Sequence, residues 1–157
     1  MKENMSTRAI QDLNRTDLSF EWVKSEHEEK GAEFAARATG FPCDRTVKTL
    51  VVDLGGRKYC LALLPGDRQL DLKQLAHVFA VKRTAMADNV TAERLTGYLV
   101  GGISPFGTIQ ALPYVMEMRI REYAEVLIIA GQRGVMLKMA PEDIVKARGC
   151  RVESIAR

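Results

Sequence analysis

The sequence is poor in the residues that hold metals and disulfides. Its three cysteines, Cys43, Cys60 and Cys150, lie far apart and form no C-x-x-C pair. This spacing argues against a disulfide framework or a zinc site, and it fits the reduced thiols of a cytoplasmic protein. The only two histidines are His27 and His77, which further weakens a metal site. We therefore expect a protein without a metal or another cofactor.

Long apolar runs are also lacking. No stretch of about 18 apolar residues is present, so we expect no transmembrane helix and no membrane partner. Residues 1–15 are polar and charged, unlike a secretory signal, which favours a cytoplasmic location. The 157 residues show no repeat or linker and predict a single domain over 1–157. The net charge of +3 permits a polyanionic partner without requiring one.

Short helical and strand patterns follow one another along the chain. We expect helices over 6–13, 32–38, 72–79, from 89 or 91 to 97, and 141–148. Ser6 or Thr7 should cap the first of these helices, and Asp71 the third. We expect strands over 18–23, 46–54, 57–64, 114–118, 125–130 and 135–139, with short additions over 81–84 and 150–155. The pattern predicts an α/β fold, a single mixed sheet of about seven strands with short helices around it.

Two apolar runs flank Gly55-Gly56 and give the strongest structural signal. They predict a β-hairpin, and their nearly continuous apolar character places it in the centre of the sheet. Lys48 interrupts the first run, where it shares a strand face with Leu50 and Val52. A lysine in such a strand must reach water at the strand end, pair with an acid or line a polar pocket.

The segment 97–107 holds four glycines and one proline in eleven residues. Gly101-Gly102 followed by Ser104-Pro105 cannot form the interior of a helix. One interpretation is a fixed loop with a row of bare backbone N–H groups, which can hold an anion or an oxyanion. The other interpretation is a tight turn between two elements.

Other candidate side chains carry weaker signals. His27 lies among Glu26, Glu28 and Glu29, which is typical of a solvated charged loop. Arg133 lies in a Gly-Gln-Arg-Gly turn, where it either belongs to the turn or reaches a phosphate. Ser104 is no nucleophile elbow, because a proline follows it directly.

Several of these segments together resemble the YbaK family of aminoacyl-tRNA editing proteins. The order and spacing match over roughly residues 18 to 150. The resemblance rests on Lys48-Thr49-Leu50-Val51, Gln69-Leu70-Asp71-Leu72-Lys73, Met86-Ala87-Asp88, the glycine-rich segment 97–105 and Arg133-Gly134. Within the family, the sequence is most similar to bacterial Cys-tRNA(Pro) deacylases, which are freestanding relatives of the insertion domain of prolyl-tRNA synthetase.

The resemblance implies hydrolysis of the ester that joins a mischarged amino acid to the tRNA 3′ end. It implies a key role for Lys48 beside Thr49, and a loop over Gly101–Pro105 that shapes the pocket and offers backbone groups to the ester. A protein nucleophile is not needed, because the thiol of a cysteine substrate or a positioned water can attack. The candidate catalytic residues are thus Lys48, Gly101 and Ser104, and the candidate substrate-binding residues are His27, Thr49, Gly102, Ile103, Pro105 and Arg133.

Three departures from the family pattern concern the pocket walls. Ser25 replaces a tyrosine, Met136 replaces an acid, and the segment from His27 to Gly40 is shorter. We expect the chain to act in trans on Cys-tRNA(Pro), with tRNA as partner and prolyl-tRNA synthetase as a candidate second partner. The alternatives are another mischarged tRNA such as Ala-tRNA(Pro), a non-catalytic module that binds tRNA or a synthetase, and a small-molecule-binding domain without an RNA partner.

Overall fold

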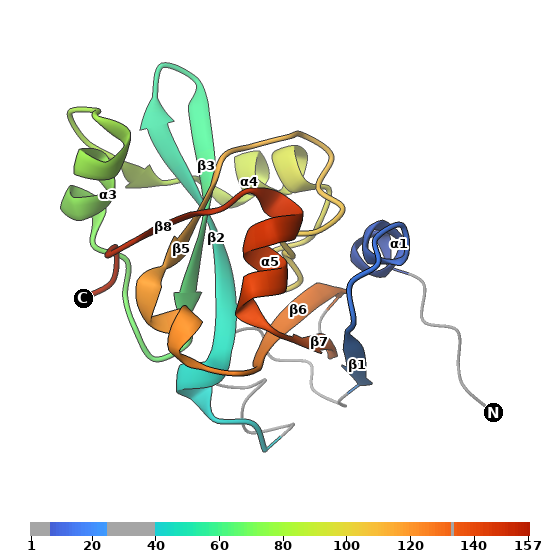
Figure 1. Ribbon diagram of the computed structural model, residues 1–157. Coiled ribbons are helices and arrows are strands. Elements are labelled where there is room, and N and C mark those ends of the chain that lie inside the picture. Colours follow the sequence, from blue (N-terminus) through green and yellow to red (C-terminus); the bar gives the residue numbers. More distant parts are fainter. Residues whose placement is uncertain (1–6, 25–39, 133) are drawn as a thin grey trace.

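The computed structural model describes residues 7–24, 40–132 and 134–157, which form one mixed sheet with helices around it (Figure 1). The helices are α1 Arg8–Asn14, α3 Leu72–Phe79, α4 Asn89–Thr96 and α5 Pro141–Arg148, with 3-10 turns η1 Cys43–Arg45 and η2 Met118–Glu122. The strands are β1 Glu21–Lys24, β2 Thr46–Gly55, β3 Lys58–Pro65, β4 Ala85–Met86, β5 Tyr114–Glu117, β6 Val126–Gln132, β7 Val135–Met139 and β8 Arg151–Glu153. The α/β class and the mixed sheet are confirmed.

The predicted hairpin is confirmed and lies in the centre of the sheet. The strand order is β1-β7-β6-β2-β3-β5-β8, with β4 paired to β2 outside this path. The hairpin and the β6–β7 pair are antiparallel, whereas β2–β6, β3–β5 and β5–β8 are parallel. Strands β2 and β3 are thus flanked on both sides, which is why their sequences can be apolar on both faces.

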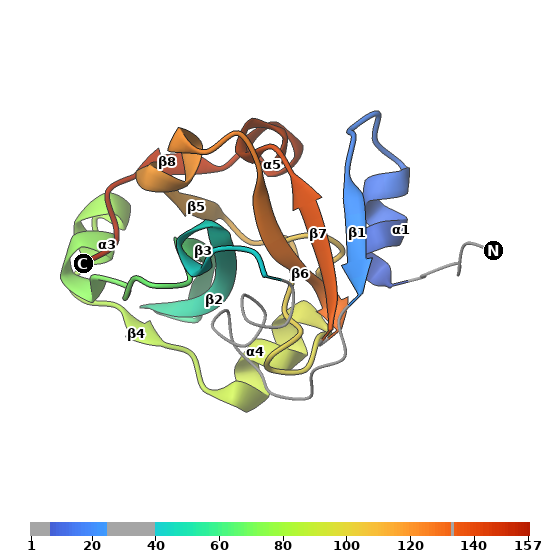
Figure 2. The same cartoon turned by 90° about the horizontal axis from the view of Figure 1, so that it is seen from below.

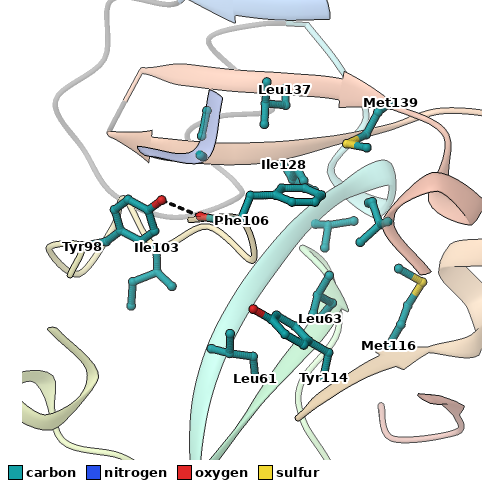
Figure 3. Packing of buried hydrophobic residues seen from close by; sticks show 14 of the residues in the cluster. Leu61, Leu63, Tyr98, Ile103, Phe106, Tyr114, Met116, Ile128, Leu137 and Met139 are labelled. Atoms are coloured by element: carbon teal, nitrogen blue, oxygen red, sulfur yellow. Dashed lines mark hydrogen bonds between the residues drawn. The ribbon is translucent and has the colours of Figure 1, made fainter. Parts of the chain in front are cut away.

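Two hydrophobic cores cover the two faces of the hairpin. The larger core contains Val47, Val51, Leu61 and Leu63 of the hairpin, together with residues of α1, α4 and α5. Figure 3 shows Phe106 of the glycine-rich loop within this core, among side chains from several strands. The smaller core contains residues of the opposite hairpin face packed against Leu75 of α3.

The predicted helix ends are largely confirmed. Thr7 and Asp71 cap α1 and α3, each accepting a hydrogen bond from a backbone N–H three residues later. Pro141 opens α5, and Gly97 ends α4 in the left-handed conformation. The N-cap of α4 is Asp88, whose carboxylate accepts the N–H of Thr91, so α4 begins at the first of the two expected residues. The expected helix over 32–38 lies outside the described residues.

Three strand predictions need correction. Residues 81–84 form no strand, because this segment turns back onto α3, and the short strand β4 follows it at Ala85–Met86. The predicted strand over 18–23 is limited to Glu21–Lys24, and that over 150–155 to Arg151–Glu153. The described residues therefore contain eight strands rather than about seven.

The glycine-rich loop is held by a hydrogen bond within the loop and by side chains from two distant elements. The Tyr98 hydroxyl donates a hydrogen bond to the carbonyl of Phe106, across the loop (Figure 3). Tyr114 of β5 donates to the carbonyl of Pro105 at 2.9 Å, and the N–H of Gly107 donates to Asp12 of α1 at 2.9 Å. Burial raises the pKa of Tyr98 to about 12, so its hydroxyl remains a donor at neutral pH.

The carboxylate of Glu117 fastens the C-terminal segment to the end of β5. Its side chain is 1% exposed and accepts the N–H groups of Ile155 at 2.9 Å and Ala156 at 3.2 Å. It also accepts the N–H of Arg119 at 2.9 Å. These bonds satisfy a buried charge that would otherwise be costly.

We expect Tyr98→Phe to lower the free energy of unfolding by about 1–2 kcal/mol, because the Phe106 carbonyl loses its buried donor. For a chain of this length the loss corresponds to a fall of roughly 2–8 °C in Tm. The matched control is Tyr59→Phe, since the half-buried Tyr59 hydroxyl has no hydrogen-bond partner within the described residues. Equal shifts in both variants, measured by thermal denaturation, would contradict this role of Tyr98.

We expect Glu117→Ala to cost about 2–3 kcal/mol, because it leaves the N–H groups of Ile155 and Ala156 without their acceptor. Urea denaturation measures the loss. Glu122→Ala, an exposed change in the adjacent turn η2, should remain within about 0.5 kcal/mol of the wild type. A Glu117→Ala variant as stable as Glu122→Ala would show that the carboxylate does not fasten the C-terminus.

Candidate active site

A cavity of about 370 Å³ opens at one edge of β2. Its volume lies in the range of small-molecule sites. Four successive residues of β2, together with β4, α4, the glycine-rich loop and β6, form its wall. The lining residues are Lys48, Thr49, Leu50, Val51, Met86, Ala87, Asn89, Ala92, Val100, Gly101, Ile103 and Ile129.

The cavity exists because the pairing of β2 is interrupted on this edge. The first two residues of β2, Thr46 and Val47, pair with β6. Farther along the same edge, Val52 and Asp53 pair with β4. Within the described residues no strand covers the interval 48–51 between these two ladders. The edge of a central strand is thus open to the cavity for about four residues.

The backbone of Thr49 points to this open edge. The carbonyl of Val51 accepts the N–H of Ala87 at 3.1 Å, which fixes the direction of the backbone groups of Val51. Backbone groups of alternate residues in a strand point to the same edge, so those of Thr49 face the same way. The side chain of Thr49 is buried, with 8% exposed. Thr49 and Lys48, which are predicted from the sequence to share one site, thus both line the cavity.

Lys48 is half-buried and is the one ionisable side chain among the described residues that line the cavity. Its Nζ lies 3.5 Å from the carbonyl oxygen of Gly66, in the turn after β3. The structure places Lys48 in the wall of a pocket, although this wall is mainly apolar rather than polar as the sequence interpretation had it. A positive charge against a mainly apolar wall acts on a ligand with little screening by water.

The glycine-rich loop offers some bare N–H groups, though not a complete row. The N–H of Val100 donates to Glu93 at 2.8 Å, and that of Gly102 donates to the carbonyl of Leu99 at 2.9 Å. In the described part of the chain, the N–H groups of Gly101 and Ile103 meet no acceptor. The loop therefore presents two donors that a ligand can use, and both residues line the cavity.

Two backbone features explain the glycines of this loop. Gly101 has a φ of +96°, which side-chain-bearing residues rarely adopt. At Gly102 a Cβ would lie 3.2 Å from the Cα of Gln132, so the loop approaches the end of β6 too closely for a larger residue. Both glycines are thus needed for the loop to reach the cavity.

Ser104 and Pro105 are fully buried and do not line the cavity. The Ser104 hydroxyl accepts the N–H of Phe106 at 3.3 Å, and the Pro105 carbonyl accepts the hydroxyl of Tyr114. Their observed contacts hold the loop in shape. The other two candidates, His27 and Arg133, lie outside the described residues.

The sequence did not identify Glu93 and Ile129 as parts of the site. Glu93 holds the start of the loop through Val100, and Ile129 forms the wall on the side of β6. Glu93 lies four residues before the helix-ending Gly97, a spacing that places it next to the following loop. Ile129 looks like any other residue of a buried strand, so no sequence signal could have distinguished it.

The position of Met136 accounts for one departure from the family pattern, the methionine that replaces an acid. Its side chain is fully buried in a small cluster with Leu127, beside Ile129. Met136 pairs with Ile129 across the β6–β7 ladder, so it supports the cavity wall from behind without lining it. An apolar residue here is compatible with an apolar wall. Ser25 lies outside the described residues.

Neither a metal cluster nor a membrane helix emerges from the described ranges. Residues 7–24, 40–132 and 134–157 contain no group of three histidine, cysteine or acidic side chains placed to hold a metal ion. No helix within these ranges has the length and apolar character needed to cross a membrane.

Comparison with known proteins connects this site to tRNA editing. Residues 26–147 match the aminoacyl-tRNA editing domain family. EbsC of Enterococcus faecalis, provisionally named a Cys-tRNA(Pro)/Cys-tRNA(Cys) deacylase, is 33% identical over 82% of this chain and 77% of its own. The multifunctional Ser/Thr-tRNA deacylase ProXp-y of Escherichia coli K12 is 31% identical over 85% of this chain and 83% of its own.

Solved structures agree with this result at the level of the fold. A crystal structure provisionally described as a trans-editing enzyme for prolyl-tRNA synthetase has a TM-score of 0.88 and 23% identity, covering 98% of this chain and 99% of its own. The proline–tRNA ligase of Pelobacter propionicus is similar in sequence, with 29% identity over 60% of this chain and 16% of the ligase. The match over 26–147 and the sequence similarity to EbsC show that the chain belongs to the aminoacyl-tRNA editing domain family.

Proposed function

We propose that the chain is an aminoacyl-tRNA deacylase that acts in trans, with Cys-tRNA(Pro) as its substrate. The observation that carries this proposal is the open edge of β2, where Lys48 and the bare N–H groups of Gly101 and Ile103 line one cavity. A positive charge and two fixed donors suit an ester whose carbonyl oxygen becomes negative during attack. The names of the relatives support the same reaction class.

In the proposed reaction, a nucleophile adds to the ester carbonyl and the resulting oxyanion collapses. With water, the C–O bond to the ribose breaks, the ribose oxygen takes a proton, and the free amino acid leaves. With a cysteine substrate, its own thiol can attack instead: the C–S bond forms, the C–O bond to the ribose breaks, the thiol proton passes to the ribose oxygen, and a cyclic thioester leaves, which water then opens to free cysteine. Lys48 and the N–H groups of Gly101 and Ile103 would stabilise the oxyanion in either route. No nucleophile of the protein is required, because water or the substrate thiol attacks.

The cavity wall favours an amino acid without a positively charged side chain. Its lining includes Leu50, Val51, Ala92, Ile103 and Ile129, and none of the described lining residues is acidic. A positively charged substrate side chain would lose hydration here and meet Lys48 without gaining a partner of opposite charge. Cysteine and alanine both meet this requirement, which keeps Ala-tRNA(Pro) as the alternative substrate.

The proposed partners follow from the reaction. The acceptor end of tRNA is the substrate, and prolyl-tRNA synthetase is the partner that we propose for delivering it, since the chain resembles a segment of such synthetases. We place the reaction in the cytoplasm, where tRNA is charged.

We expect Lys48→Ala to lower kcat for deacylation about 100- to 1000-fold, because the oxyanion loses its positive charge. Lys58→Ala, which removes an exposed lysine from the same hairpin, should retain the wild-type rate. Deacylation of radiolabelled Cys-tRNA(Pro) measures both. A Lys48→Ala variant that is folded, as judged by its Tm, and as fast as Lys58→Ala would remove Lys48 from the mechanism.

Substrate choice is tested with Cys-, Ala- and Pro-tRNA(Pro), and with Cys-tRNA(Cys). We expect fast hydrolysis of Cys-tRNA(Pro) and no attack on Pro-tRNA(Pro), whose ring is larger and lacks a thiol. Clearance of Ala-tRNA(Pro) alone would establish the alternative substrate. If the protein binds tRNA but hydrolyses none of the four, the proposed substrate is wrong, and either the true substrate lies outside this panel or the chain is a binding module.

A further inference from the structure

A second cavity, of about 360 Å³, lies between α3 and the segment 80–84. Four of its lining residues, Lys73, His77, Lys82 and Arg83, are basic, and none of the described lining residues is acidic. All four are exposed, and none is ion-paired with another described residue. This combination leaves several positive groups available to a negatively charged ligand.

The backbone holds these side chains in a fixed arrangement. Lys73 and His77 are four residues apart on α3 and therefore lie on one face of the helix. The segment after the helix returns to it, because the N–H of Val81 donates to the carbonyl of Ala76 at 3.0 Å. The buried Thr84 then donates its hydroxyl to the carbonyl of Leu72 at 2.7 Å. The positions of Lys82 and Arg83 are thus determined by α3.

The basic cavity is connected to the candidate active site by β4. Arg83 precedes Met86 by three residues, which span at most about 11 Å of extended chain. Met86 itself lines the cavity at the edge of β2. Figure 2 shows α3, β4 and α4 following one another along one side of the molecule. A ligand that occupies the active site could therefore extend along β4 to the basic residues.

A cavity beside α1, which contains three arginines, is different. It is lined by Arg8, Arg15, Arg148 and Asp12, and there Arg148 pairs with Asp12. Arg8 donates to the carbonyl of Gly107 at 3.0 Å. Two of its three arginines therefore serve to hold α1, α5 and the glycine-rich loop together. For the charges of the cavity beside α3, the described part of the chain contains no comparable partners.

We propose that Lys73, His77, Lys82 and Arg83 form a phosphate-binding surface for the acceptor strand of tRNA, next to the ester in the active site. The inference rests on the proposed function, which supplies the RNA. Lysine and arginine bind phosphate oxygens irrespective of the base, so this surface would position the 3′ end without reading its sequence. It would contribute substrate affinity rather than the chemical step.

The test compares two charge-matched double variants of the full chain. Lys82→Ser with Arg83→Ser removes two charges of the basic cavity, and Lys146→Ser with Arg15→Ser removes one lysine and one arginine that are exposed on α5 and after α1. The affinity of each protein for uncharged tRNA(Pro) is measured by fluorescence anisotropy at several salt concentrations. The kinetics of Cys-tRNA(Pro) deacylation give kcat and KM for the same proteins.

We expect the first double variant to bind tRNA(Pro) roughly tenfold more weakly at low salt, with the slope of log Kd against log salt reduced by about two. Its KM should rise with kcat unchanged, while the control double variant keeps the wild-type slope and KM. Equal losses of tRNA affinity in both double variants would show a general charge effect and would reject the proposed phosphate-binding surface. If tRNA binding depends on Lys82 and Arg83 but the wild type hydrolyses no substrate, this inference stands and the proposed function is rejected. If the wild type hydrolyses Cys-tRNA(Pro) and the first double variant binds tRNA(Pro) as tightly as the wild type, the proposed function stands and this inference is rejected.

Discussion

The site depends on an interruption in the pairing of the central strand. Strand β2 pairs with β3 from Val47 to Gly55, but among the described residues its other edge is covered by β6 only at the beginning and by β4 only near the end. The interval 48–51 lies between them and opens to the cavity. Because β2 is buried on both faces, the open edge is a rigid one. A strand held in this way can keep the backbone of Thr49 and the charge of Lys48 in fixed positions, as electrostatic catalysis requires.

The glycine-rich loop completes the site because hydrogen bonds within the loop and from neighbouring elements hold it in place. Tyr98 and Tyr114 donate to carbonyls near its end, and Asp12 accepts the N–H of Gly107. Phe106 places a ring in the main core, which ties the loop to the rest of the fold. Gly101 and Ile103 line the cavity, and their N–H groups meet no acceptor among the described residues, so these donors remain available to a substrate. The order of the loop therefore comes both from its own residues and from the elements around it.

Charge is distributed unevenly over the molecule in a way that matches a nucleic-acid substrate. A single lysine lies among apolar residues at the proposed reaction centre, where low polarity strengthens its effect on an ester. The four basic residues proposed to bind phosphate lie on α3 and just after it, where water screens them; the nearest of them in sequence, Arg83, precedes Met86 by three residues. The two proposals thus assign chemistry and affinity to different surfaces, which β4 connects.

The sequence alone determined the elements and the residue types of the site. Apolar runs around Gly55-Gly56 specify the hairpin, and Asp71 and Pro141 specify helix starts, because these signals act between residues close in the chain. Lys48 was identifiable because burying a charged side chain in an apolar strand is costly unless it reaches water, pairs with an acid or lines a pocket. Only the tertiary structure decided that β6 and β4 leave part of β2 uncovered, and that Ile129 forms the wall opposite. Those features arise from pairings between residues far apart in the chain, whose geometry no local pattern encodes.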